Sequence, residues 1–170
     1  MSTTQRWLAR GAVAAIVLVC FGLWVYVFLI ADPKPPDKLR DAAYARGAAP
    51  VCKTALDQVY AGDLYFAKAA SPQDQGALVE KADAILTTMV QQLKALPPPS
   101  DADDARVVQG WLADWDTYLS DRVAWVTKLK TGQAAVFYVH SHEGGTPVTD
   151  AMDEFALANN LDDCKTPNGF

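Results

Sequence analysis

The sequence has few of the residues and motifs on which most enzymes depend. It contains two histidines and three cysteines in 170 residues. It has no Gly-rich phosphate loop, no Gly-x-Ser-x-Gly nucleophile elbow and no Cys-x-x-Cys pair. These absences argue against phosphate-loop nucleotide binding, serine hydrolase chemistry and thioredoxin-like redox chemistry. The sequence therefore predicts a protein that is not an enzyme and that needs no cofactor.

Clusters of basic residues are also missing. After residue 11 the chain carries 13 Lys and Arg against 20 Asp and Glu, a net charge of −7 at pH 7. No run of Lys or Arg interrupts this negative balance, so the phosphate backbone of a nucleic acid would be repelled. We expect no nucleic-acid partner.

One long segment lacks charge altogether. The run "AVAAIVLVCFGLWVYVFLIA", residues 12–31, has no charged side chain and no proline. About 20 helical residues at about 1.5 Å each span the hydrocarbon core of a bilayer. A cleaved signal peptide is the alternative, but its apolar region is shorter, about 7–15 residues, and ends at small residues. Here Leu29 occupies the place of a small residue, which favours an uncleaved transmembrane signal anchor that binds the bilayer.

The cysteines predict a single disulfide. Cys20 lies inside the apolar run, which leaves Cys52 and Cys164 as the only pair in the rest of the chain. A bond between them would close a loop of more than one hundred residues and would stabilise the fold by about 4–5 kcal/mol. Two unrelated buried thiols are the alternative.

The orientation in the membrane follows from this pair rather than from the basic residues. Disulfides belong to oxidising compartments, so we expect a cytoplasmic N-terminus and an extracytoplasmic domain at the plasma membrane. The basic residues do not fix this topology, because two precede the run and four follow it closely: Arg6, Arg10, Lys34, Lys38, Arg40 and Arg46.

These observations divide the chain into four parts. Residues 1–11 are a short cytoplasmic segment, residues 12–31 the anchor, residues 32–50 a Pro-rich tether that begins "DPKPPDK", and residues 51–170 the extracytoplasmic domain. Apolar spacing predicts helices near residues 51–70, 72–96, 101–131 and 150–159. The expected fold is mainly all-α, a three- to four-helix antiparallel bundle stapled by one disulfide.

The ends of these helices carry recognisable signals. Ser71 followed by Pro72 is a typical helix start, and Ser100 with Asp103 resembles a capping box. In the second helix, Glu80, Asp83 and Lys94 are assigned to the face opposite the apolar stripe. After residue 132, "AAVFYVHSH" favours an extended segment in a small hairpin, and Thr149 is the expected cap of the last helix.

Three of the five tryptophans fall in "VQGWLADWDTYLSDRVAWVTKLK", residues 108–130. At about 100° per residue they join an aliphatic stripe in an apolar arc about 140° wide, the usual width of a core-facing surface. The alternative is that part of this face binds a ligand or a partner. That surface would consist of Trp111, Trp115, Tyr118, Arg122 and Trp125.

Arg122 is the one charged residue within the aromatic stripe. A buried guanidinium needs an anion, and Asp63 occupies a similar position within the apolar stripe of the first predicted helix. We therefore expect a structural ion pair between Asp63 and Arg122.

His140 and His142 are two residues apart, so in an extended strand their imidazoles point the same way and could reach one metal ion. Structural zinc sites usually have four protein ligands. A solvated turn explains the two histidines better, and we expect no metal site.

The segments "WLADWDTYLSDR" (residues 111–122) and "PVTDAMDEFALANNLDDCKTP" (residues 147–167) resemble small single-pass membrane proteins that are common in actinobacteria. In these uncharacterised proteins an N-terminal anchor precedes an extracytoplasmic helical domain with a cysteine near each end. The resemblance implies the same topology for this chain, and it implies no activity and no functional residues.

The expected function is that of a non-enzymatic envelope protein, an accessory or interaction subunit that binds another membrane or envelope protein. The alternative is an extracytoplasmic binding module that holds a small apolar or lipid-like ligand against the Trp-rich helix.

Overall fold

The structure of the protein is a computed structural model that describes residues 15–25, 37–62, 64 and 69–167. The chain divides into two compact units, Met1–Pro35 and Pro36–Phe170. In the first unit, residues 15–25 are helical, and large apolar side chains such as Ile16, Leu18 and Phe21 are 63–70% exposed. No helix within the described ranges is long and apolar enough to cross a membrane. The predicted span, residues 12–31, extends beyond those ranges at both ends.

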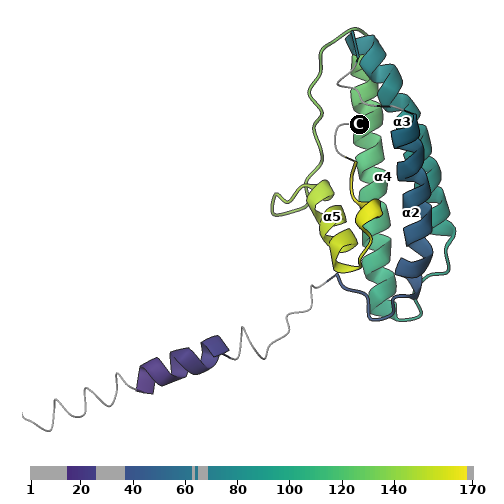
Figure 1. The fold of residues 1–170 in the computed structure, drawn as a ribbon. Coiled ribbons are helices and arrows are strands. Elements are labelled where there is room, and N and C mark those ends of the chain that lie inside the picture. Colours follow the sequence, from purple (N-terminus) through teal and green to yellow (C-terminus); the bar gives the residue numbers. More distant parts are fainter. Residues whose placement is uncertain (1–14, 26–36, 63, 65–68, 168–170) are drawn as a thin grey trace, which may run out of the picture. The chain divides into compact units, whose positions relative to one another are not determined.

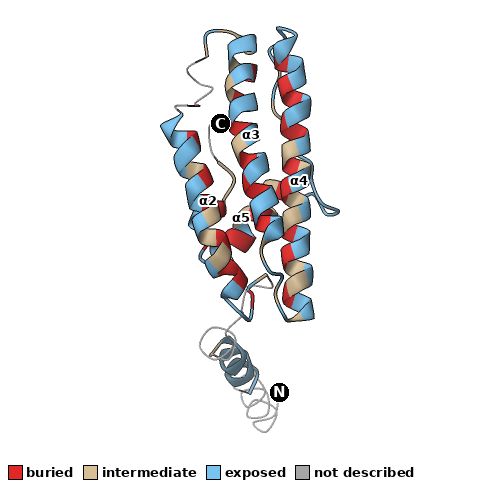
Figure 2. Cartoon of the chain, turned by 90° about the vertical axis from the view of Figure 1, so that its right-hand side faces the viewer, coloured by how far each residue is buried: buried red, intermediate tan, exposed pale blue. Residues whose placement is uncertain are grey.

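The second unit is a bundle of antiparallel helices (Figure 1). Three long helices lie side by side, and the shorter α5 packs against α4. The buried residues lie on the faces where the helices meet, and the residues on the outer faces are exposed (Figure 2). The mainly helical fold with one disulfide is confirmed. Its elements are α2 (Ala43–Ala61), α3 (Pro72–Ala95), α4 (Ala102–Lys130), α5 (Val148–Ala158) and the 3₁₀ turn η3 (Asp162–Cys164).

The first helix of this unit begins earlier and ends earlier than the sequence predicts. The sequence predicts a tether that includes residues 43–50, but these residues form the first two turns of α2, with Pro50 inside the helix. Proline in a helix interior costs about 3 kcal/mol, and burial of Tyr44 and Ala48 offsets part of that cost. Helix α2 stops at Ala61, where Gly62 caps it, well before residue 70.

The starts of the next two helices follow local capping chemistry. Ser71 is the N-cap of α3 and accepts a hydrogen bond from the backbone N–H of Asp74, as predicted. The cap of α4 is Asp101 rather than Ser100, because the Asp101 carboxylate accepts from the N–H groups of both Asp103 and Asp104. A carboxylate is also the better cap electrostatically, since it faces the positive end of the helix dipole.

An extended segment, residues 133–140, connects α4 to α5 and runs back along one side of the bundle (Figure 1). It forms no named strand in the part of the chain that the structure describes. The predicted hairpin is reduced to one antiparallel bridge between Ser141 and Pro147. Helix α5 then begins at Val148, with Pro147 rather than Thr149 at the cap position.

Cys52 on α2 and Cys164 in η3 form the predicted disulfide across 112 positions of sequence. Both cysteines are buried, at 0% and 1% exposure. The bond therefore ties the C-terminal turn to the first helix of the unit from inside the core.

Candidate functional site

The aromatic stripe of α4 is part of the core. Trp115 is completely buried, and Trp111, Tyr118 and Trp125 are 3–6% exposed. Trp111 stacks on Phe155 of α5 at 4.6 Å between ring centroids, and the Trp115 ring meets the Tyr118 ring edge-on at 5.7 Å. These contacts fill the space between helices, which is the ordinary role of large aromatic residues in a small domain.

A buried polar cluster lies within this stripe and centres on Arg122, which is 0% exposed. Its Nε donates a hydrogen bond to the Asp83 carboxylate of α3, within an ion pair. Its Nη1 donates to the Tyr118 hydroxyl at 3.0 Å, and the guanidinium carbon lies 5.4 Å from the centroid of the Tyr118 ring. The arginine therefore links α3 to α4 through a carboxylate and a phenol.

The sequence pointed to a different carboxylate for this pair. Asp63 lies outside the described residues. Asp83, assigned to the exposed face of α3, is in fact 7% exposed, so that assignment is wrong. At about 100° per residue, Asp83 falls about 60° from Leu86 on the side of Val90, at the edge of the buried arc. This spacing is the sequence signal that could have identified Asp83, but the prediction named Asp63 instead.

The electrostatics of the cluster reflect burial. Burial raises the pKa of Asp83, and the neighbouring Arg122 opposes that rise without cancelling it. Burial likewise raises the pKa of Tyr118, and Arg122 opposes that rise as well. Oδ2 of Asp83 is buried and has no hydrogen-bond partner among the described residues. The cluster is therefore incompletely satisfied and is a costly element of the core.

The two histidines are held apart rather than together. Asp121 of α4 accepts hydrogen bonds from the backbone N–H of His140 at 2.8 Å and contacts the His140 Nδ1 at 2.5 Å. His142 Nε2 lies 3.2 Å from the Asp114 carboxylate. Asp114 and Asp121 are seven residues apart on α4, about 10 Å along its axis. Within the described ranges no three His, Cys, Asp or Glu residues are grouped as metal ligands.

The two aspartates differ in burial from their histidine partners. The Asp121 side chain is 6% exposed, whereas the His140 side chain is 73% exposed. Burial raises the pKa of Asp114, and His142 opposes that rise. The buried Asp121 carboxylate thus lies beside the ring of His140 in the extended segment, and the partly buried Asp114 carboxylate lies beside the ring of His142. The arrangement fastens this segment to α4.

A small hollow lies beside Trp111. Its volume is about 200 Å³, and it is lined by Asp37, Val107, Gly110, Trp111, Asp114, Ala151 and Phe155. Pockets that bury drug-sized ligands usually measure about 300–1,000 Å³. The hollow beside Trp111 is therefore large enough only for a small molecule.

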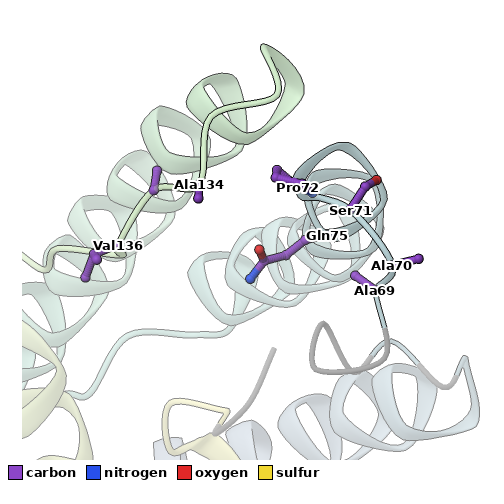
Figure 3. Close-up of a pocket in the computed structure, with 8 residues that line it drawn as sticks. Ala69, Ala70, Ser71, Pro72, Gln75, Ala134 and Val136 are labelled. Carbon is purple, nitrogen blue, oxygen red and sulfur yellow. The ribbon is translucent and has the colours of Figure 1, made fainter.

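A wider and more open hollow separates the start of α3 from the extended segment (Figure 3). Its volume is about 480 Å³, and it is lined by Ala69, Ala70, Ser71, Pro72, Gln75, Ala134, Ala135 and Val136. None of these side chains is charged, and the Ser71 hydroxyl is engaged in the helix cap. The hollow has the chemistry of a contact surface rather than of a reaction site.

Comparison with protein-family models, with curated proteins and with solved structures finds no match for this chain. The resemblance to actinobacterial single-pass membrane proteins therefore stays a prediction.

Proposed function

We propose that the chain is a non-enzymatic, membrane-anchored envelope protein whose helical domain lies outside the membrane. The observation that carries this proposal is the Cys52–Cys164 disulfide, because disulfides form and persist in oxidising compartments. A domain in such a compartment must be exported, and the apolar run of residues 12–31 is suited to export and retention as an anchor. Exposed apolar side chains on residues 15–25 fit a lipid environment better than water.

We further propose that the domain acts as an accessory subunit that binds another membrane or envelope protein. The side chains that could take part in acid–base chemistry pair with other side chains of the same domain. Arg122 pairs with Asp83, His140 with Asp121, and His142 with Asp114. What the domain offers to a partner is its surface, which includes the exposed apolar residues Val123 and Leu157.

The location is tested by protease digestion of sealed, right-side-out membrane vesicles that contain the full chain. An extracytoplasmic domain is digested without detergent, whereas a control protein on the cytoplasmic side is protected. Protection of the domain in intact vesicles would disprove the proposed topology.

The binding role is tested by crosslinking in native membranes followed by purification in mild detergent. We expect one membrane or envelope protein to be recovered in constant ratio with the chain. A matched control replaces residues 12–31 with an unrelated transmembrane span, and the same partner should still be recovered through the domain. Repeated recovery of the chain without another protein would contradict the accessory role.

A second candidate function is the binding of a small ligand that carries a hydrogen-bond acceptor beside Trp111. The observation that favours it is the indole N–H of Trp111, which is buried without a hydrogen-bond partner among the described residues and belongs to a side chain that lines the 200 Å³ hollow. Native mass spectrometry of the purified chain tests this role. A retained small molecule that is lost on Gly110→Leu, which fills the hollow, supports it, and a chain without bound mass excludes it.

A further inference from the structure

Most backbone groups of the extended segment between α4 and α5 have no hydrogen-bond partner among the described residues. Within residues 133–140, the bonds to other described residues engage only the carbonyl of Ala135, which accepts from the Trp125 indole at 2.7 Å, and the N–H and C=O groups of His140. The N–H and C=O groups of residues 136–139 have no partner in the part of the chain that the structure describes. An extended segment with open backbone groups is a template for pairing with another strand.

The side chains of the segment alternate as they do in a half-buried strand. Phe137 packs against Tyr118 and Trp125, with ring centroids 5.9 and 5.1 Å apart. Val136 and Tyr138 point away from the bundle and are 69% and 76% exposed. The inner face is therefore fixed to α4, and the outer face presents a β-branched and an aromatic residue to solvent.

The segment lacks the devices that usually protect a strand edge. Proteins prevent edge pairing with charged side chains, prolines or a covering element. Residues 131–139, "TGQAAVFYV", contain no charge and no proline. Near its start the segment borders the open hollow of about 480 Å³ (Figure 3).

We propose that residues 134–139 pair antiparallel with the same segment of a second copy of this chain, with Phe137 at the two-fold axis. The sequence of the segment favours a copy of itself over another strand, because this register sets Val136 of one copy opposite Tyr138 of the other, twice. Aromatic and β-branched residues form favourable cross-strand pairs. Residues 136 and 138 exchange backbone hydrogen bonds through groups that have no partner among the described residues of one copy.

The charge distribution agrees with this site of contact. Residues 12–170 carry a net charge of −7, so two copies repel each other over most of their surfaces. The uncharged segment is a place where they meet without direct contact between like charges. Because salt screens the long-range repulsion, the dimer forms more tightly at higher ionic strength.

Disulfide trapping tests the register. Two full-length variants, Val136→Cys and Tyr138→Cys, are mixed in mild detergent. They carry tags of different size, and both also carry Cys20→Ser, which removes the free cysteine. In the proposed register, position 136 of one chain lies directly opposite position 138 of the other, with about 4.5–5.5 Å between their Cβ atoms. Each position lies farther, about 7–8 Å, from the same position of the other chain. The mixed disulfide should exceed either homodimeric disulfide several-fold. A mixed disulfide in no more than the twofold excess over each homodimer that random pairing gives would overturn the register.

Light scattering on the full-length chain without added cysteines tests the dimer itself. Tyr138→Lys places two like charges at the pairing site and removes two cross-strand pairs, so the dissociation constant should rise by at least about tenfold. The matched control is Val123→Lys on α4, which is 60% exposed and lies outside the segment, and its dimer should persist. A monomeric wild-type chain, equal weakening by both substitutions, or a different protein paired with the segment in place of the second copy would each disprove the proposal.

Discussion

Arg122 and Asp83 form a buried ion pair, and the structure shows why burying these two charges costs free energy. Arg122 is 0% exposed and Asp83 is 7% exposed, and one oxygen of the carboxylate has no hydrogen bond among the described residues. Removal of two charges from water costs several kcal/mol for each ion, and their attraction recovers that cost only in good geometry. Such a pair specifies how α3 and α4 align more than it stabilises the fold.

The first prediction concerns this pair. Arg122→Met keeps most of the side-chain volume but leaves the Asp83 carboxylate buried without its cation, so the free energy of unfolding should fall by about 3–5 kcal/mol. Denaturant unfolding of the full chain, followed by tryptophan fluorescence, measures the change. The matched control is Lys94→Met, which removes the exposed ion pair with Asp116 and should cost less than about 1 kcal/mol. Similar losses in both variants would contradict a structural role for the buried pair.

The second prediction is the pH dependence of that loss. Burial raises the pKa of Asp83, and Arg122 is the group that opposes the rise, so Arg122→Met raises this pKa further. An acid whose pKa is higher in the folded state binds more protons when folded, and its folded state loses stability as pH rises through that pKa. The destabilisation by Arg122→Met should therefore be smaller near pH 4.5 than near pH 7.5. Unfolding curves at both pH values measure it, and Asp83→Asn in the same background should remove the difference.

At the scale of the element, the position of the extended segment depends on contacts with side chains of α4. Asp121 accepts from the His140 backbone and contacts its ring, Asp114 contacts His142, and the Trp125 indole donates to the Ala135 carbonyl. These contacts hold the extended segment in place without a neighbouring strand among the described residues, and they leave its outer edge exposed. The same helix thus builds the core on one face and positions a binding edge on another.

The third prediction follows from this attachment. Asp121→Ala removes a buried acceptor of two contacts and leaves the His140 N–H unsatisfied, a loss of about 1.5–3 kcal/mol. Amide hydrogen exchange in the segment, measured at His140, whose N–H donates to Asp121, should then accelerate by at least about tenfold, while the core amides of α3 keep their protection. The matched control is Asp116→Ala on the same helix, where the aspartate is exposed and pairs with Lys94. Unchanged exchange in the segment would show that packing alone holds it.

Local signals explain which elements the sequence predicts well. Ser71 followed by Pro72 marks the start of α3 because capping chemistry is local. The start of α2 is not predictable in this way, because Pro50 opposes a helix and burial of Tyr44 in the tertiary structure overrides it. The partners of His140 and His142 are also tertiary, since Asp121 and Asp114 lie nineteen and twenty-eight positions away.

For the whole molecule, the predictions that succeed depend on composition and count. A chain with two cysteines outside its apolar run has one possible intramolecular disulfide there, and Cys52–Cys164 is confirmed. The width of the apolar arc on α4 predicts burial of the tryptophans, which is also confirmed. The buried polar cluster could not be predicted from composition and residue counts alone. Asp83 is at the edge of its helical arc, and only the packing of α3 on α4 shows that this edge is covered.

The last prediction concerns the disulfide as a constraint on the whole bundle. The bond joins residues 112 positions apart, and a loop of this length loses much of its conformational entropy when it is closed in the unfolded chain. Replacement of both cysteines, Cys52→Ala with Cys164→Ala, should lower the free energy of unfolding by about 4–5 kcal/mol, measured by denaturant unfolding of the full chain under non-reducing conditions. Cys20→Ser is the matched control, because Cys20 is exposed and unbonded, and it should leave the midpoint unchanged. If the double variant lost less than about 1 kcal/mol, the packing of η3 against α2 would hold the C-terminal turn without the bond.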